Sequence, residues 1–437
     1  MSFQVSPGVR VREIDLTNVV PAVSSSIGAF AGAFSWGPVE EVKQVTSEKN
    51  LAETFGVPSL SNNTSYFTAA GFLQYGNNLQ TVRCETAALK NAISDGTATA
   101  VLIKGRENYD AAYSAGQATI GPWAAKYPGT LGNSLKIEIC APGHYATYAN
   151  AANFDSAPGT SQYAESQGVL GALDELHILV IDEGGAWTGT AGSVLEKFAF
   201  VSQAADAKLS NGESNFYKDV INNRSAYVWW MDHDAVLTDA GTNLSSSASG
   251  FAFTGSSTVI TDSLTLGVDD NTLTASAIQT GFDLLEDGET IDVNMLICPP
   301  LDNSLASASS SCVAVANDLI AIATARKDCL AVISPPVPFT ANPAGQSITD
   351  VNGGSVSASA VNNVVAFADY LTSSSYGTLD STALKVYDKY NDVFIDIPSS
   401  GHVAGLMANT DTVADAWFSP AGFTRGQILG VTRVSFN

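Results

Sequence analysis

"IDVNMLICPP" (residues 291–300) is followed by "SCVAVANDLIAIATARKD" (311–328) and "CLAVISPP" (329–336). The first and last stretches are short apolar runs typical of buried strands, and the middle one is helical in composition and length. A strand, a helix and a strand in this order form a unit whose two strands lie parallel in one sheet. This part of the chain therefore predicts an α/β fold with a largely parallel sheet.

The N-terminal third adds a compact strand–helix–helix–strand unit. "SIGAFAGAF" (26–34) is a strand of small residues, and "LQTVRC" (79–84) is a second strand. Between them, "SEKNLAETFG" (47–56) is a helix capped around Thr46 or Ser47, and "SYFTAAGFLQYG" (65–76) is a helix that ends at its glycine.

The middle of the chain gives a less regular pattern. "LKIEIC" (135–140), "LHILVID" (176–182) and "SAYVWWMD" (225–232) predict strands. "SVLEKFAFVSQAADAKL" (193–209) predicts an amphipathic helix with Val194, Phe198, Val201 and Ala205 on one stripe. Residues 236–281 are rich in Ser and Thr and lack Lys and Arg. They are interpreted as a β-rich surface insertion, with a flexible linker as the alternative.

These segments predict a mixed α/β (α+β) chain of several domains. Residues 1–20 form an extended arm, because Val9 and Val11 alternate with Arg10 and Arg12 before the phase slips at Glu13 and Ile14. Residues 21–86 together with about 345–437 form a discontinuous inner α/β domain. Residues 87–344 form an outer α/β domain that carries the insertion at about 236–281.

Composition and charge exclude several classes of function. The chain has 437 residues and a net charge of −23, with 20 basic residues among 43 acidic ones. Nucleic-acid binding needs clustered Lys and Arg, and an anionic membrane surface repels such a chain, so we expect neither partner. The longest apolar runs, "IGAFAGAF" and "LHILVI", are far shorter than the roughly 20 residues that span a bilayer. The five cysteines lack metal or redox spacing and predict buried free thiols.

Three groups of residues are candidates for chemistry. Asp232, His233 and Asp234 follow an apolar strand, where α/β enzymes place catalytic or metal-binding groups. Ser399, His402 and Asp411 are the residue types of a hydrolytic triad, and Cys329 lies near Arg326 and Lys327, which would lower its pKa. In each case the structural interpretation is preferred, since no phosphate loop, nucleophile elbow or zinc spacing accompanies them. No catalytic residue, cofactor or metal is predicted.

Six stretches together resemble the tail sheath proteins of bacteriophages with contractile tails. They are "SPGVRVREIDLT", "GAFAGAFSWGPV", "YPGTLGNSLKIEI", "ARKDCLAVISPP", "VYDKYNDVFIDIPSSGHVAGLMANTD" and "AWFSPAGFTRGQI", and they run from residue 6 to residue 428. The resemblance implies a structural protein that is not an enzyme. It implies subunits that stack as hexameric rings around the tail tube and contract to drive the tube through the host envelope.

The resemblance also implies partners and an interface. The partners are other sheath subunits, the tail tube protein, the baseplate and the tail terminator, in a virion tail assembled in the host cytoplasm. In the family the N-terminal arm adds a strand to a neighbouring subunit. The expected interface residues are therefore Val9, Arg10, Val11, Arg12, Glu13, Ile14, Arg425 and Arg433.

The chain departs from the family pattern after "SPAGFTRG". Family members continue into a C-terminal domain that contacts the tube and receives the arms of neighbours. We therefore expect the chain to be truncated and to stay monomeric where a longer chain forms tubes. Two other functions stay open. An α/β hydrolase-like enzyme would rest on Asp232, His233 and Asp234, and a virion adhesin that binds glycans would rest on residues 236–281.

Overall fold

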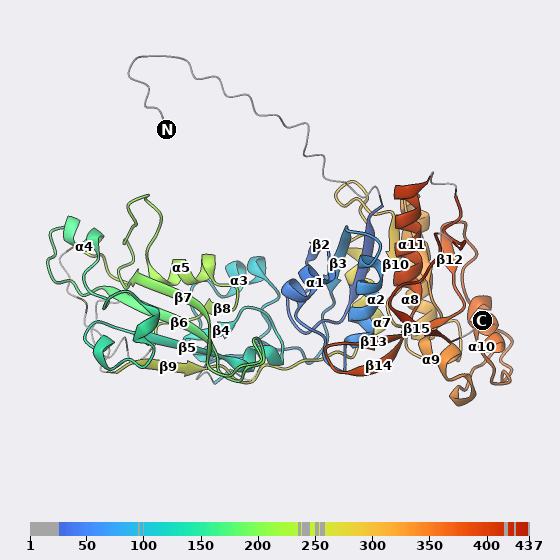
Figure 1. Ribbon diagram of the computed structural model, residues 1–437, viewed down its shortest axis with the longest axis horizontal. Coiled ribbons are helices and arrows are strands. Elements are labelled where there is room, and N and C mark those ends of the chain that lie inside the picture. The colour runs from blue at the N-terminus through green and yellow to red at the C-terminus, as the bar shows by residue number, and fades with distance from the viewer. Residues whose placement is uncertain are drawn as a thin grey trace, which may run out of the picture.

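The computed structural model describes residues 26–94, 97–98, 100–234, 237, 245–249, 253, 258–414, 418–423 and 425–435. These residues form two lobes joined end to end (Figure 1). We call the lobe that contains β1 and β10 the inner lobe and the lobe that contains β5 and β6 the outer lobe. The predicted arm, residues 1–20, lies outside the described residues.

The inner lobe is built on a sheet whose described strands run in the order β12-β11-β10-β1-β3-β2. Neighbouring strands are parallel except for β2, which is antiparallel to β3. This confirms the α/β prediction. The strands are Gly28–Gly32 (β1), Val42–Val45 (β2), Leu79–Arg83 (β3), Met295–Ile297 (β10), Leu330–Ile333 (β11) and Gly377–Leu379 (β12).

Helices cover both faces of this sheet, because successive strand residues point to opposite sides. Ala29 and Ala31 of β1 belong to the hydrophobic core under α7 and α8, whereas Phe30 belongs to the core under α2 and α11. The helices of the inner lobe are Glu48–Phe55 (α1), Asn63–Leu73 (α2), Ala275–Asp283 (α7), Ser311–Arg326 (α8), Val337–Ala341 (α9), Ala360–Asp369 (α10) and Ser400–Val413 (α11). Ser47 caps α1 as predicted, since its side chain accepts a hydrogen bond from the Asn50 amide.

A small antiparallel sheet packs on the α2 side of the inner lobe. Its described strands are Ala383–Asp388 (β13), Val393–Pro398 (β14) and Val431–Val434 (β15), in the order β14-β13-β15. Leu384, Val386 and Ile397 point inward and join the same core as Phe30.

The outer lobe is antiparallel rather than parallel. One sheet has the order β7-β6-β5-β9, and a pair of strands, β4 and β8, lies beside it. The strands are Trp123–Ala125 (β4), Leu135–Cys140 (β5), Glu175–Asp182 (β6), Ser193–Ser202 (β7), Val228–Trp230 (β8) and Ile260–Ser263 (β9). The helices are Arg106–Ala112 (α3), Gln162–Ser166 (α4) and Tyr217–Arg224 (α5).

The predicted helix over residues 193–209 is wrong, because β7 occupies its first ten residues. Two register shifts interrupt the pairing of β7 with β6, and Phe200 adopts a positive φ of 56° at one of them. Such β-bulges break the alternation of a strand. They place Leu195, Phe198 and Val201 in the same core at spacings of three, which imitates a helical stripe, whereas Val194 is exposed.

The strand pairing also divides the chain differently from the expected boundary near residue 345. β10 pairs with β1, and β11 pairs with β10, so residues 295–333 belong to the inner lobe and not to the outer domain that was expected over residues 87–344. The segment 236–281 is described only in part. Within it, β9 pairs with β5 in the outer lobe, and α7 packs against β1 in the inner lobe.

Arg83 fixes the junction of the lobes. The guanidinium is buried, and its Nη1 donates to the carbonyl oxygens of Gly37 at 3.0 Å and Pro128 at 2.9 Å. Trp36 crosses the same junction and packs edge-on against Tyr127 and Trp187 of the outer lobe. A buried cation bound to carbonyls of both lobes favours one relative orientation, since leaving these groups unpaired in the protein interior is costly.

Candidate functional site

Asp232, His233 and Asp234 do lie at the end of β8, as predicted, but they do not form an open site. The hydroxyl of Tyr217 bonds His233 Nδ1, and Ser245 Oγ lies 2.6 Å from His233 Nε2. Burial lowers the pKa of His233. Within the described residues, no group of three or more His, Cys, Asp or Glu side chains could hold a metal ion. Both imidazole nitrogens therefore serve local hydrogen bonding.

Ser399, His402 and Asp411 are not assembled into a triad. Ser399 Oγ donates to the Thr382 carbonyl at 3.0 Å, and Asp411 bonds Ser26. His402 is buried between α11 and α2, where burial lowers its pKa to about 4. An imidazole that stays neutral and faces no carboxylate of the set cannot relay a proton between the other two.

Cys329 is an unreactive thiol. It is buried, and burial raises its pKa to about 11. Arg326, which would have to stabilise the thiolate, instead pairs with Asp328 at 2.9 Å and donates to the Ile291 carbonyl at 3.0 Å. The thiol stays protonated near neutral pH, so nucleophilic chemistry at this position is not expected.

The carboxyl edge of the parallel sheet, where α/β proteins bind ligands, is filled by the start of α11. The Ser400 amide donates to Ser334 Oγ at 2.8 Å, and Ser400 Oγ donates to the Cys298 carbonyl at 2.6 Å. Asp380 bonds Ser334 in the same place, and burial raises its pKa to about 6. The helix terminus thus occupies the crevice that a substrate would need.

The small sheet β14-β13-β15 presents an exposed face that carries large aromatic side chains. Tyr387 of β13 and Phe394 of β14 are paired in register, with ring centroids 5.2 Å apart, and they are 44% and 56% exposed. The sequence "LKVYDKYNDVFIDIP" contained the signal for this exposed face, because its inward residues Leu384 and Val386 alternate with outward ones. Large aromatic side chains exposed on a sheet are typical of interaction surfaces.

Arg433 lies on this same face, whereas Arg425 does not belong to a strand. Arg433 pairs with Lys385 in the strand register, and its Nη2 lies 3.8 Å from Asp396 Oδ1 on β14. Arg425 stacks its guanidinium over Phe418 at 5.1 Å. The other six expected interface residues, Val9 to Ile14, lie outside the described residues. The structure thus brings one expected residue to the exposed sheet.

β15 is an edge strand within the described part of the chain, where it pairs with β13 alone. The Ser435 amide donates to the Ala383 carbonyl at 2.8 Å. In an antiparallel pair every second residue bonds the neighbouring strand, so the Val434 amide points away from β13. An edge of this kind can accept a further strand by backbone hydrogen bonds.

No protein-family model matches the chain. The chain is 25% identical to the tail sheath protein of Enterobacteria phage T4, in a match that covers 99% of the chain and 76% of the relative. The tail sheath protein of Vibrio phage KVP40 is 24% identical (99% and 77% covered), and that of Salmonella phage ViI is 25% identical (100% and 75% covered).

Two solved structures also match. The sheath tail protein of Desulfitobacterium hafniense aligns with a TM-score of 0.42 and 13% identity, covering 94% of this chain and 61% of its own. The sheath tail protein Lin1278 of Listeria innocua aligns with a TM-score of 0.38 and 13% identity, covering 90% and 77%.

The sequence matches extend over nearly the whole chain and are all to proteins of one kind. They confirm the resemblance to the tail sheath proteins of contractile-tailed bacteriophages, and the function that they support is that of a structural sheath subunit. The prediction that it is not an enzyme is confirmed by the same relatives.

Proposed function

We propose that the chain polymerises with other copies as stacked hexameric rings around a tail tube and contracts to drive the tube through a host envelope. The relatives support assembly into a sheath polymer in the virion tail. Contacts with the baseplate and the tail terminator, and assembly in the host cytoplasm, belong to the same proposal. No described helix is long and apolar enough to cross a membrane.

We further propose that the free edge of β15 receives an extended strand from a second copy, and that this strand is the arm at Val9–Ile14. The observation that carries the proposal is the orientation of the Val434 amide, which points to the open side of β15. Arg433 on β15 would then border the added strand, whereas Tyr387 on β13 and Phe394 on β14 lie one and two strands further into the sheet. Backbone hydrogen bonds of this kind keep subunits connected while the subunits themselves rotate as rigid bodies.

Immunogold electron microscopy tests the sheath function. Antibodies raised against this chain should label the tails of the parent virus particles along their whole length, before and after shortening. Label confined to the capsid, the tail fibres or the tube would contradict the proposal.

Photo-crosslinking tests the strand addition. A benzoylphenylalanine side chain in place of Val434 should crosslink to residues 9–14, and a mixture of ¹⁴N- and ¹⁵N-labelled chains should show that the two peptides come from different copies. Val434→Pro removes the outward amide without breaking a hydrogen bond to β13, so it should reduce assembly, whereas Val434→Thr should not. Crosslinks only within one copy, or full assembly of Val434→Pro, would refute the proposed site.

The adhesin alternative rests on residues 236–281, which the structure describes only in part, and the tail sheath relatives do not support it. The α/β hydrolase-like alternative is not proposed further, because the tail sheath relatives and the occupied sheet edge oppose it.

A further inference from the structure

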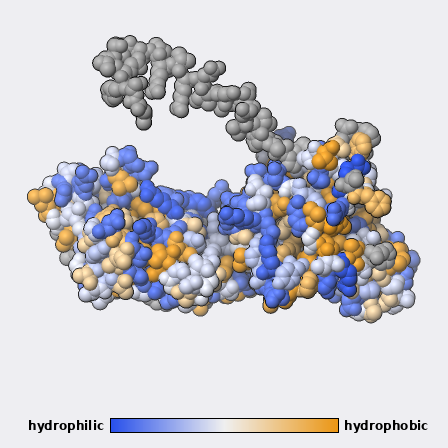
Figure 2. All heavy atoms as spheres, in the orientation of Figure 1, coloured by the Kyte–Doolittle hydropathy of each residue, from blue (hydrophilic) through white to orange (hydrophobic). Residues whose placement is uncertain are grey.

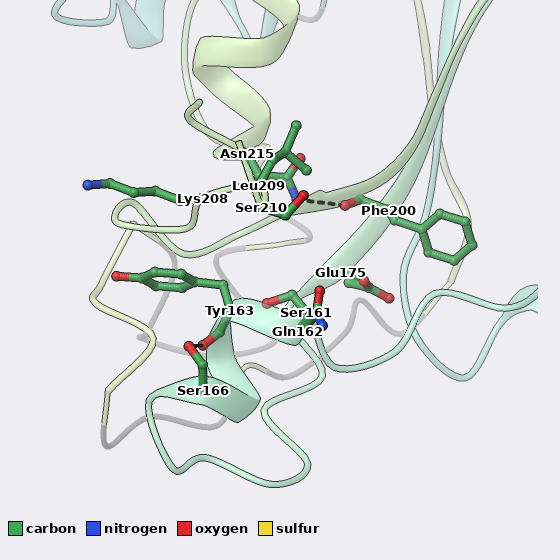
Figure 3. A pocket seen from close by; sticks show the side chains of 10 residues that line it. All are labelled: Ser161, Gln162, Tyr163, Ser166, Glu175, Phe200, Lys208, Leu209, Ser210 and Asn215. Carbon is green, nitrogen blue, oxygen red and sulfur yellow. Dashed lines mark hydrogen bonds between the residues drawn. The ribbon is translucent and has the colours of Figure 1, made fainter. Parts of the chain in front are cut away.

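The surface of the chain carries scattered rather than convergent chemical groups. In the hollow beside α4, Lys208 and Glu175 point outward on opposite sides (Figure 3). Hydrophobic and hydrophilic residues are interspersed over the face drawn in Figure 2. The interior of the inner lobe differs, because it holds a histidine whose ring nitrogens lack hydrogen-bond partners within the described part of the chain.

This histidine is His402, near the start of α11. The residue is 1% exposed, so neither Nδ1 nor Nε2 reaches solvent. A polar atom that loses water and gains no partner on folding destabilises the folded state, and such atoms are uncommon in native proteins. A catalytic triad does not explain the histidine, since Ser399 and Asp411 form hydrogen bonds elsewhere.

Two elements enclose the imidazole. The first is α2, which lies beside α11 on one face of the inner lobe (Figure 1). The ring packs on Gly71, where a Cβ would lie 2.5 Å from Nδ1, and it lies edge-on to Tyr75 with ring centroids 6.1 Å apart. The second is the backbone at Leu429, which is close enough to oppose the effect of burial on the pKa of His402.

The Tyr75 hydroxyl ties residues 425–430, here named the latch segment, over the imidazole. It accepts a hydrogen bond from the Leu429 amide at 2.6 Å and donates one to the Gln427 carbonyl at 3.3 Å. Leu429 is 43% exposed and β15 begins at Val431, so the latch segment is a surface strap that leads into the edge strand. One side chain of α2 therefore contacts both the histidine and the latch segment.

Titratable side chains on the elements around the imidazole do not compensate a charge on it. They are Tyr75 on α2, Asp380 and Cys298 beneath the first turn of α11, Arg425 in the latch segment and Asp411 on α11 itself. Burial lowers the pKa of His402 from about 6.5 to about 4, and the Leu429 backbone is the group that opposes this shift. Burial also raises the pKa of Tyr75, so its hydroxyl stays neutral.

Protonation of His402 would place an unpaired charge in the protein interior, which is costly. Two movements could bring water to that charge. Separation of α11 from α2 would break a contact so close that a Cβ on Gly401 would lie 1.9 Å from the carbonyl oxygen of Thr68. Release of the latch segment breaks two hydrogen bonds to one hydroxyl at the surface. The second movement disrupts less, because local opening is favoured where few buried contacts are lost.

We propose that His402 is an acid-sensitive latch, in which protonation of the imidazole releases residues 425–430 from Tyr75 while α2 and α11 stay packed. The neutral ring favours the closed latch above about pH 6.5, and this preference is lost as the pH falls toward 4. The latch acts within one copy of the chain, so it goes beyond the proposed assembly and does not depend on it.

Hydrogen-exchange mass spectrometry on the full chain tests the proposal, because the Leu429 amide is protected while it donates to Tyr75. The protection of a peptide that contains Leu429 should fall about tenfold from pH 7.5 to pH 5.5, after correction for the rate of the same unstructured peptide at each pH. Peptides from α2 and α11 should keep their protection. The raised pKa of Asp380 acts in the opposite direction, since it stabilises the fold as the pH falls.

His402→Leu and His402→Phe remove the titrating group, so the tenfold fall should vanish in each variant that circular dichroism shows to be folded. His144→Gln is the matched control, because His144 lies in the outer lobe after β5, and it should keep the fall. Protection that does not change with pH in the unmodified chain would overturn the proposal. So would a fall that persists without His402, or an equal loss of protection in α2 and α11. Crosslinking between copies is unaffected by these outcomes, so the two proposals fail separately.

Discussion

Substitution of Gly401 by alanine should destabilise the inner lobe, because α11 crosses α2 with no room for a side chain. A Cβ at position 401 would lie 1.9 Å from the carbonyl oxygen of Thr68 on α2. The clashing atom belongs to the backbone and not to the end of a flexible side chain. The two helices must therefore separate by about 1 Å or more to restore a normal van der Waals distance.

Two opposing effects set the size of the loss in unfolding free energy. Alanine favours a helix over glycine by about 1 kcal/mol. Overpacking of a buried contact costs about 1–3 kcal/mol, and the upper end applies where backbone atoms must move. The expected net loss is therefore about 2 kcal/mol of unfolding free energy. Gly405→Ala should cost less, because its nearest atom, 2.6 Å away, belongs to the side chain of Tyr75.

Urea unfolding followed by circular dichroism at 222 nm measures the loss. Gly159→Ala is the control, since its nearest neighbour would lie 3.9 Å away, and it should change stability by no more than about 0.5 kcal/mol. Four of the six tryptophans, Trp123, Trp187, Trp229 and Trp230, lie in the outer lobe, so tryptophan fluorescence reports mainly on that lobe. If Gly401→Ala proved as stable as the unmodified chain, the close crossing of α2 and α11 would be wrong.

Two further predictions concern the lobe junction and the sheet edge. Arg83→Met should lower the unfolding free energy by about 3 kcal/mol, because the carbonyls of Gly37 and Pro128 lose a buried charged donor. Limited proteolysis should then cut between the lobes faster, and a cleavage pattern equal to that of the unmodified chain would refute this role. Asp380 has a pKa raised to about 6, so the folded chain binds its proton more tightly than the unfolded chain. The protonated Asp380 side chain contributes fully to the unfolding free energy below about pH 4. This contribution falls by about 2–3 kcal/mol as the pH rises to about 6. Asp380→Asn should remove that fall in urea titrations at several pH values, and an unchanged pH profile would contradict it.

Much of the inner lobe could be predicted because its signals are local. The cap at Ser47, the small-residue strand β1 and the strand–helix–strand unit around α8 depend on neighbouring residues alone. The same holds for the preferred structural interpretations of His233, His402 and Cys329, since their spacing matched no catalytic pattern.

The exposed sheet was only partly predictable. Arg433 was singled out through the family resemblance, and the structure places it beside Lys385 on β15. The pairing of Tyr387 with Phe394 was missed, although the alternation around Val386 contained the signal. Alternation gives the two faces of a strand, but it does not say which face a partner covers.

The α/β class, the resemblance to tail sheath proteins and the small residues along α11 could be read from the amino-acid sequence alone. The strand β7, the place of β10 and β11 in the sheet of β1, and the contact of Gly401 with Thr68 became evident only in the folded chain. Helices and caps are stabilised by close neighbours in the chain, whereas sheet register, lobe membership and close helix crossings depend on residues distant in sequence.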